Sequence, residues 1–335
     1  TLSSSSAASD VYKRQIIGGL AGDALTTGNY NIGIGLNAGM DLTSGAGNII
    51  LGYNAGDAMT DTNYTVLIGQ FAGGAINSSD ANGAVAIGYQ AGTAITSGQN
   101  STLLGYEAGL SLVTGNNNTL IGYQTGKLLT HSNNVAIGTL AFDAATSAED
   151  SVVIGYGAGS DITTGDGNVL IGHAAGDNAS TLGNSIGIGK ESLGGANATL
   201  LTGANASVAI GYQAAGNASG NWGNGVYIGY LAGNHDINGG NVAVGYKALG
   251  DSDGGQNNTA LGYQSGENIT TGDDNIGIGY DALTANTTGS YNTAVGMSAL
   301  RYSTTASHNT GVGYNSLTDN NVKFVKLKNQ PYYNG

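Results

Sequence analysis

The stretch Ser207-Val-Ala-Ile-Gly-Tyr-Gln-Ala214 recurs, with small changes, along almost the whole chain of 335 residues. Another copy is Asn48-Ile-Ile-Leu-Gly-Tyr-Asn-Ala-Gly56. Aligned on their central glycines, 18 copies run from Gly18 to Gly313. Of the 17 intervals between successive glycines, 12 are 17 residues long, as between Gly35 and Gly52. The residue before the glycine is Ile, Leu or Val in every copy, and the residue three before it is Val, Ile or Thr in 17 of 18. A fixed short period of this kind predicts a solenoid in which each unit stacks on its neighbours.

Each copy has the pattern of a short half-buried strand, because alternate positions are β-branched or aliphatic and a glycine closes them. A 17-residue unit is too short for a helix hairpin or a propeller blade. It suits one coil with two short strands and two tight turns. The sequence therefore predicts an all-β fold, a single parallel β-solenoid (β-roll) of about 18 coils with a 17-residue period. Stacking of parallel coils about 4.8 Å apart predicts a rod roughly 80 to 85 Å long.

Within each strand, the residues one and three before the glycine share a face, which we interpret as the interior because it is aliphatic. This structural core ladder contains Ile34, Leu51, Ile68, Ile87, Leu104, Ile121, Ile137, Ile154, Ile171, Ile188, Ile210 and Ile228. The residue between them then faces outward, in an uncharged column longer than a soluble monomer normally exposes. That column predicts an oligomer face with Leu67, Leu103, Leu120, Val153, Leu170, Ala209 and Ala243. A covering strand or domain, or a stripe tolerated because its side chains are small, are the alternatives.

Other columns of the repeat predict further ladders. Asn or Ser occupies the position four before the glycine in 14 copies, which predicts stacked amides at a turn. Tyrosine follows the glycine in 11 copies and predicts a stacked aromatic ladder, with a sugar-binding stripe as the alternative. This tyrosine ladder contains Tyr53, Tyr89, Tyr106, Tyr123, Tyr156, Tyr212, Tyr230, Tyr246, Tyr263, Tyr280 and Tyr314.

Side-chain volume is kept constant between two positions of each coil. The residue four after the central glycine is Gly in 11 copies, and the residue seven after it is then usually large and apolar, as in Gly56 and Met59. Where the first position becomes leucine, as at Leu283 and Leu300, the second becomes small or polar, as at Asn286 and Ser303. Close packing requires such compensation, so we predict two coil subtypes that fill one interior.

Composition excludes several classes of protein. The chain has no cysteine, which excludes disulfide scaffolds, Cys-based zinc sites and thiol catalysis. A hydrophobic content of 40% is too high for a disordered tail, and no apolar run approaches the length of a membrane span. A net charge of −13 makes nucleic acid a poor partner. The four histidines lie far apart in different repeat columns, so we predict no metal site, no cofactor and no catalytic residue, and hence no enzyme.

The two ends of the chain differ from the repeat. Residues 4–15 (SSSAASDVYKRQ) resemble translated sequencing-adapter sequence, so residues 1–15 are expected to be a non-native leader. Residues 320–335 contain three of the nine basic residues and the only proline. We expect residues 16–319 to form the solenoid and residues 320–335 to begin a divergent flank.

The repeat units resemble the head repeats of trimeric autotransporter adhesins and related repeats of phage tail fibres. The resemblance covers residues 16–317 and rests on the cores Asn134–Gly138, Ser207–Gly211 and Asn241–Gly245. The 17-residue period is longer than that of the adhesin heads. The resemblance implies a left-handed parallel β-roll and a parallel homotrimer, and it transfers no catalytic residue.

We therefore expect a structural or adhesive fibre segment, the rigid stalk or head of a phage tail fibre or a bacterial surface adhesin. The expected location is extracellular, and the expected partners are further copies of the chain and a glycan or protein receptor on a host surface. One alternative is a tailspike-like β-helix that binds or degrades polysaccharide; it needs long acid-bearing insertions, and only Gly194–Ala206 is expanded. The other is an ice-binding solenoid, which is disfavoured because adjacent threonines such as Thr26 and Thr27 must point in opposite directions.

Overall fold

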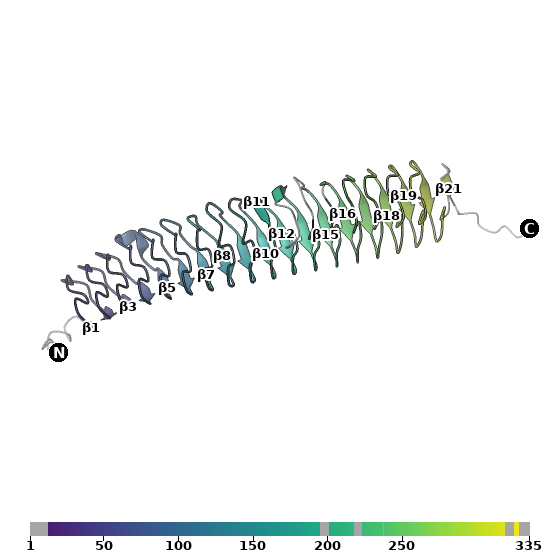
Figure 1. Cartoon of the computed structure of the whole chain (residues 1–335). Coiled ribbons are helices and arrows are strands. Elements are labelled where there is room, and N and C mark those ends of the chain that lie inside the picture. The colour runs from purple at the N-terminus through teal and green to yellow at the C-terminus, as the bar shows by residue number, and fades with distance from the viewer. Residues whose placement is uncertain (1–12, 195–200, 218–222, 237, 319–324, 328–335) are drawn as a thin grey trace, which may run out of the picture. The chain divides into compact units, whose positions relative to one another are not determined.

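The computed structural model describes residues 13–194, 201–217, 223–236, 238–318 and 325–327. The chain forms two compact units, residues 1–167 and 168–335. Within each unit, short parallel strands lie side by side, one strand to a coil in nearly every coil, and turns make up the rest of the coil (Figure 1). The fold is thus an all-β parallel solenoid, as predicted, but the second strand expected in each coil is replaced by turns in most of the described coils.

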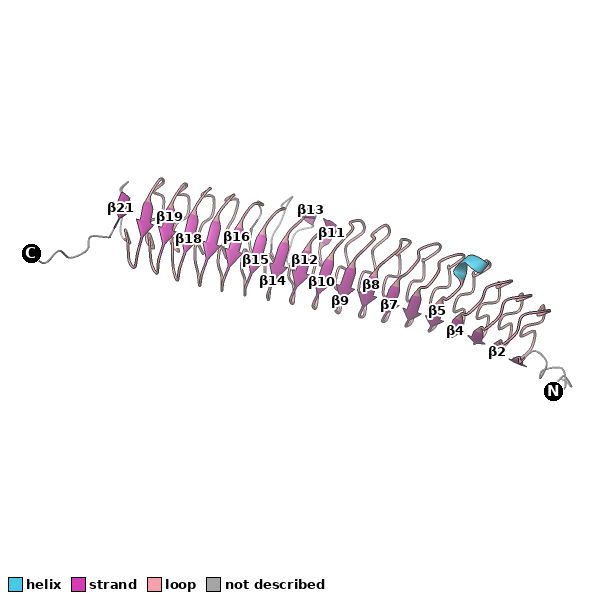
Figure 2. Cartoon of the chain, turned by 180° about the vertical axis from the view of Figure 1, so that it is seen from behind, coloured by secondary structure: helices cyan, strands magenta, loops and turns pink. Residues whose placement is uncertain are grey.

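The strands of the first unit are β1 (Gln15–Ile17), β2 (Ile32–Ile34), β3 (Ile49–Leu51), β4 (Val66–Ile68), β5 (Val85–Ile87), β6 (Thr102–Leu104), β7 (Thr119–Ile121), β8 (Val135–Ile137) and β9 (Val152–Ile154). The strands of the second unit are β10 (Val169–Ile171), β11 (Ala179–Gly183), β12 (Ile186–Ile188), β13 (Leu201–Asn205), β14 (Val208–Ile210), β15 (Val226–Ile228), β16 (Val242–Val244), β17 (Thr259–Leu261), β18 (Ile276–Ile278), β19 (Thr293–Val295), β20 (Thr310–Val312) and β21 (Val325–Leu327). The one helical segment among the described residues is a 3-10 turn, η1 (Ser79–Ala81) (Figure 2).

Neighbouring strands pair in parallel with the same register in every coil. Ile50 in the middle of β3, for example, pairs with Leu67 in the middle of β4. The period of the sequence repeat is therefore the length of one coil. The longest interval, between Gly189 and Gly211, is accommodated by a separate two-stranded parallel sheet of β11 and β13.

The ends of the repeat extend slightly beyond the predicted boundaries. Gln15, which the sequence assigned to the leader, begins β1 and pairs with Ile32. In the predicted C-terminal segment, Val325 pairs with Thr310, so that β21 adds to β20. Residues 1–12, 319–324 and 328–335 lie outside the described residues.

A column of glycines ends the strands. At Gly105 the backbone angle φ is +143°, and a Cβ atom placed there would lie 2.1 Å from the carbonyl oxygen of Gly122 in the next coil. The other central glycines adopt φ angles between +116° and +143°. Only glycine combines such an angle with so close an approach of two backbones. The glycine column therefore fixes where each strand stops and the chain turns.

The strands bury the face opposite to the one that we expected. The middle residue of each strand from β2 to β9 is fully buried, and the residues on either side of it are half-buried or exposed. The predicted oligomer face is wrong, because it lies inside its own solenoid: Leu67, Leu103, Leu120, Val153, Leu170, Ala209 and Ala243 are all inaccessible to solvent. The predicted core ladder is likewise wrong, because it faces outward: Ile34, Leu51, Ile68, Ile87, Leu104, Ile121, Ile137, Ile154, Ile171, Ile188, Ile210 and Ile228 are half-buried or exposed.

Packing against the turn explains this orientation. The middle side chain of a strand covers a glycine that lies four residues after a central glycine, either in its own coil or in the coil before it. A Cβ atom on Gly92 would lie 2.6 Å from Cδ1 of Leu103, and one on Gly126 would lie 2.9 Å from Cδ1 of Leu120. The middle side chains of the strands fill the space over these glycines. The residues one and three before the central glycine cannot place large side chains there as well, since protein interiors are close-packed. The middle column is therefore the core of the solenoid.

The two predicted coil subtypes are present in this core. In the first subtype, Met59 lies 2.6 Å from the position that a Cβ atom on Gly56 would take, so the large residue fills the space that glycine leaves. In the second subtype, Leu300 fills that space from a backbone with φ of +50°, and Ser303 beside it is buried. Leu300 packs in a cluster with Leu283 and Leu317.

We expect Leu300→Gly to lower the free energy of unfolding by about 2 to 4 kcal/mol, because transfer energy is lost and a cavity forms. The added change Ser303→Leu should recover part of that loss, since the hydroxyl of Ser303 is buried without a hydrogen-bond partner. Leu283→Gly is the matched case: Asn286→Leu should rescue it less, because Asn286 donates to the carbonyl of Gly289 (2.9 Å) and accepts from its N–H (3.0 Å). Urea unfolding measures both pairs. A Ser303→Leu change that destabilises the Leu300→Gly chain further contradicts the two-subtype core.

A ladder of buried amides runs beside the strands, as predicted. The backbone N–H of Asn292 donates to Oδ1 of Asn275 (3.0 Å), and Nδ2 of Asn292 donates to that oxygen (3.1 Å) and to the carbonyl of Ala306 (2.8 Å). Asn309 repeats the bonds to Oδ1 of Asn292. These bonds satisfy the amide donors, so polar side chains occupy the interior without a large desolvation penalty.

Candidate functional surface

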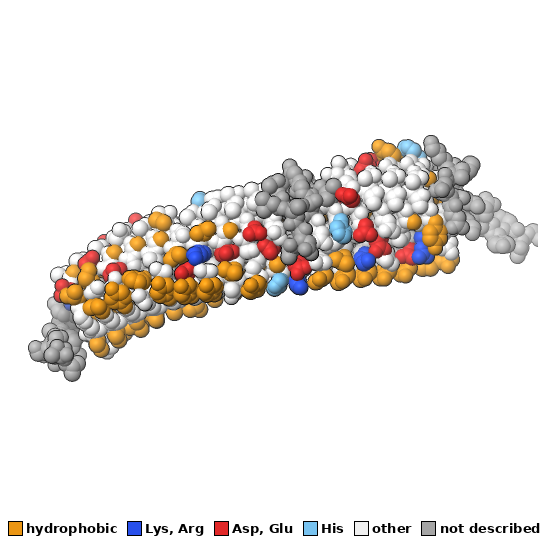
Figure 3. All heavy atoms as spheres, in the orientation of Figure 1, with side chains coloured by type: hydrophobic (Ala, Val, Ile, Leu, Met, Phe, Trp, Pro, Cys, Tyr) orange, Lys and Arg blue, Asp and Glu red, His pale blue; other side chains and the backbone are white. Residues whose placement is uncertain are grey.

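The outer side of the strands carries an uncharged surface. It consists of the residues one and three before the central glycine, which are aliphatic or threonine in β2–β10, β12 and β14–β20. We call these two columns the strand face. Its most exposed members are Ile34, Leu104, Ile171, Ile210, Ile228, Ile276, Ile278 and Val312. Figure 3 shows hydrophobic side chains gathered in a band along each unit.

Tyrosines line the margin of the strand face, directly after the central glycines. One run of stacked rings, in the first unit, contains Tyr89, Tyr106 and Tyr123. A second, in the second unit, contains Tyr212, Tyr230, Tyr246, Tyr263 and Tyr280. Ring centroids are 4.9 to 5.3 Å apart and ring planes differ by 5° to 19°. We call these two runs the tyrosine column, and they confirm the predicted ladder over these residues.

Three tyrosines of the predicted ladder lie outside these runs. Tyr53 packs edge-on against Phe71, with ring centroids 5.5 Å apart. Tyr156 and Tyr314 are exposed. Within the runs, each inner ring has a neighbouring ring on both faces. Because a sugar stacks on an open aromatic face, this arrangement favours the ladder over the sugar-binding stripe.

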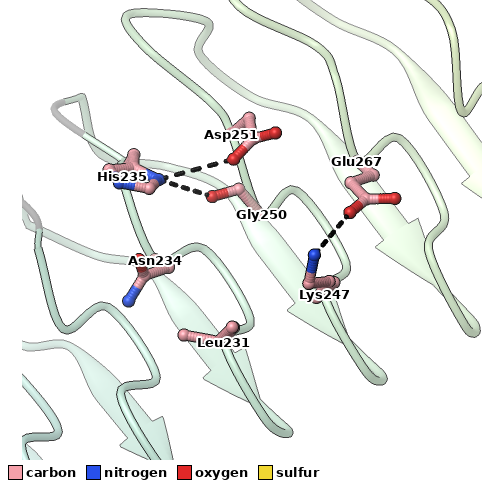
Figure 4. Close-up of a pocket in the computed structure, with 7 residues that line it drawn as sticks. All are labelled: Leu231, Asn234, His235, Lys247, Gly250, Asp251 and Glu267. Carbon is pink, nitrogen blue, oxygen red and sulfur yellow. Dashed lines mark hydrogen bonds and ion pairs between the residues drawn. The ribbon is translucent and has the colours of Figure 1, made fainter.

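A shallow pocket of about 160 Å³ opens on the second unit (Figure 4). Nζ of Lys247 lies 3.1 Å from Oε1 of Glu267, and Nδ1 of His235 lies 3.5 Å from Oδ1 of Asp251. The hydrogen bond with Glu267 raises the pKa of Lys247 above its ordinary value. Because the ionisable side chains that line the pocket contact one another, they favour a surface network over a ligand site.

One coil carries a polar cluster in its interior. Tyr227, the middle residue of β15, is fully buried, and its hydroxyl donates to Oδ2 of Asp236 (2.7 Å). Nδ2 of Asn241 donates to the same oxygen (2.7 Å), and the N–H of Asn238 donates to Oδ1 (3.1 Å). Burial raises the pKa of Asp236 to about 6, although these three hydrogen bonds oppose the shift. The repeat does not predict this cluster: most coils with glycine four residues after the central glycine carry a large apolar residue at the position of Asp236, and this one coil carries an acid.

The raised pKa of Asp236 predicts a pH-dependent stability. Between its ordinary pKa of 3.8 and about 6, the folded chain holds a proton that the unfolded chain releases. Stability from this group is therefore greatest below about pH 4 and falls as pH rises to about 6, by about 3 kcal/mol. Urea unfolding of the natural chain and of Asp236→Asn, measured from pH 4 to 7, isolates this contribution as the difference between them. A difference that does not change with pH contradicts the assignment.

The remaining ionisable groups of the described residues form no recognisable centre. Among the described residues, no group of three or more His, Cys, Asp or Glu side chains is placed to hold a metal ion. His308 stacks on Tyr291 with ring centroids 4.9 Å apart. In the same part of the chain, no helix has the length and apolar character needed to cross a membrane.

Comparison with known proteins adds no family. No protein-family model matches the chain, and a search of curated proteins finds no match. The structure supports a tandem-repeat protein with a parallel β-solenoid of 17-residue period.

Proposed function

We propose that the chain is a structural or adhesive fibre segment, a rigid stalk or head of a phage tail fibre or a bacterial surface adhesin, and not an enzyme. The supporting observation is the repetition of the same bonds along the stack of coils. Strand pairs, close-packed glycines and asparagine amides link each coil to the next within a unit. Bending or stretching such a stack must break many bonds together, which suits a part that bears load outside the cell.

We further propose that copies of the chain associate through the strand face, in a parallel homotrimer. The strand face is a continuous surface of aliphatic and threonine side chains without charge, and apolar surfaces of this extent often mark sites of association. Three residues per strand and strands about 4.8 Å apart give about 400 Å² of face for each unit of nine or more strands. Each unit would thus contribute about half of the ~800 Å² per partner that a standard interface buries.

Light scattering of paired variants tests this association. Ile34→Glu and Leu104→Glu place charges on the strand face, where the side chains are 40% and 42% exposed. Val113→Glu and Leu128→Glu are matched controls, because these side chains are 40% and 43% exposed but lie outside the strand face. We expect trimers for the natural chain and the control pair, and monomers for the strand-face pair. A natural chain that is monomeric at all concentrations refutes self-association.

The fibre function itself is tested against polysaccharide degradation, the competing activity. The chain is incubated with a panel of bacterial surface polysaccharides, and reducing ends are measured over time together with the amount of bound protein. We expect no release of reducing ends. Release with time at a low protein concentration overturns the fibre proposal in favour of a tailspike-like enzyme, whereas binding without release indicates a glycan receptor.

A further inference from the structure

Stacking in the tyrosine column holds neighbouring phenols of one chain closer together than phenols on separate molecules in solution. In the second unit, the ring of Tyr263 lies 4.9 Å from that of Tyr246 and 5.0 Å from that of Tyr280, measured between centroids. All three side chains are exposed to solvent, by 39% to 49%. The column is therefore open to a small oxidant in solution, and each phenol has its reaction partner already beside it.

We propose that the tyrosine column is a site of oxidative modification, at which a one-electron oxidant of phenols couples neighbouring tyrosines of one chain into dityrosine. This proposal is independent of the fibre function and of self-association. It needs only the stacking and exposure of the rings.

The step balances with hydrogen peroxide as the oxidant, used through a haem peroxidase. Peroxide takes one hydrogen atom from each of two phenol hydroxyls and is reduced to two molecules of water. The two phenoxyl radicals form one carbon–carbon bond between their ortho positions. The two ortho hydrogens then return to the oxygens, which restores both phenols, so the chain loses two hydrogen atoms for each link.

The geometry favours coupling inside the column. Groups fixed in contact react as if at very high concentration, so a radical on Tyr263 meets Tyr246 or Tyr280 before it meets a second molecule. Rings must tilt to bring their ortho carbons together, and the solvent beside their exposed edges leaves room for this movement.

Coupling would give the repeat a covalent link between coils. The chain has no cysteine, so it contains no disulfide. A link between Tyr246 and Tyr263 closes a loop that is one coil long, and cross-links of this kind stabilise a fold by restricting its unfolded state. We therefore expect a higher urea midpoint for the oxidised protein.

The test is treatment of the full chain with a haem peroxidase and peroxide, followed by mass spectrometry of proteolytic fragments. We expect linked fragments that join Tyr246 to Tyr263 and Tyr263 to Tyr280, in a yield that is unchanged over about a hundredfold dilution. Tyr263→Phe, which keeps a ring in the stack, should abolish both links and leave the link between Tyr89 and Tyr106. Tyr302→Phe is the matched control, because Tyr302 is exposed but lies beneath Arg301, outside the column.

Three results overturn the proposal. The first is links that join Tyr302, or Tyr64, which is also exposed and lies outside the column, as often as they join members of the column. The second is dityrosine that forms only between copies and disappears on dilution. The third is a column that stays unmodified while free tyrosine in the same reaction is coupled, which shows that the oxidant is active.

Discussion

Replacing Gly105 with alanine is expected to lower the free energy of unfolding by at least about 3 kcal/mol. The backbone at Gly105 has a φ of +143°, which side-chain-bearing residues do not adopt without strain. The new methyl group would also lie 2.1 Å from the carbonyl oxygen of Gly122, so the two coils must move apart. Hydrogen exchange should therefore increase in β6 and β7 before it increases elsewhere in the first unit.

Gly157→Ala is the matched control for this effect. Gly157 has a φ of +58°, but a Cβ atom placed there meets no atom within 4 Å. Its equivalents in other coils include Gln90 and Asn54, which carry side chains at similar angles. We expect a loss of about 1 kcal/mol or less, from backbone conformation alone. Equal losses for the two variants contradict the close approach of the glycine column.

The second large effect separates two neighbouring leucines. Leu103→Glu is expected to lower the free energy of unfolding by about 5 kcal/mol, because it removes a buried side chain and introduces an unpaired charge. Leu104→Glu should change stability by about 1 kcal/mol or less, because Leu104 is 42% exposed whereas Leu103 is inaccessible.

Circular dichroism during urea unfolding measures both variants, and light scattering reports their association. The strand face predicts that Leu104→Glu weakens association while the chain stays folded. If instead Leu103→Glu were tolerated and Leu104→Glu unfolded the chain, the inner and outer sides of the strands would be exchanged.

Periodicity made the fold predictable. The fixed interval between central glycines, the alternation before them and the Asn and Tyr columns all act between equivalent positions of successive coils. A parallel stack in register satisfies all of them at once, as the pairing of β3 with β4 illustrates. The sequence also allowed prediction of the volume compensation between Gly56 and Met59, because the total side-chain volume is conserved within one coil.

The inner and outer sides of the strand were assigned wrongly because a strand of three residues has apolar side chains on both sides. Alternation shows that Leu51 and Ile49 share a side, but it does not say which side is buried. The deciding information lay elsewhere in the coil. Asn48 lies two residues before Ile50 and therefore on the same side of the strand, and both side chains are buried. Coils with leucine four residues after the central glycine, such as that of Leu283, also carry a small residue in the middle of the strand, here Gly277. This compensation indicates that the middle residue faces the same interior as the leucine.

The cluster around Asp236 was beyond prediction from the repeat for a different reason. It occurs in one coil, so no column average reveals it. Tyr227 reaches across the interior to an acid nine residues later, and only the folded coil brings the two together.

The identical register of neighbouring strands has a consequence for how such a chain changes in evolution. Each coil presents to the next the same backbone groups and nearly the same side chains that it receives from the one before. Duplication or deletion of one complete coil therefore leaves every remaining interface intact, whereas a change of a few residues must be absorbed by an irregular element such as the separate sheet of β11 and β13. The length of a stack of coils therefore changes in whole steps of about 4.8 Å. Gain or loss of a coil thus lengthens or shortens the stack without changing any packed surface.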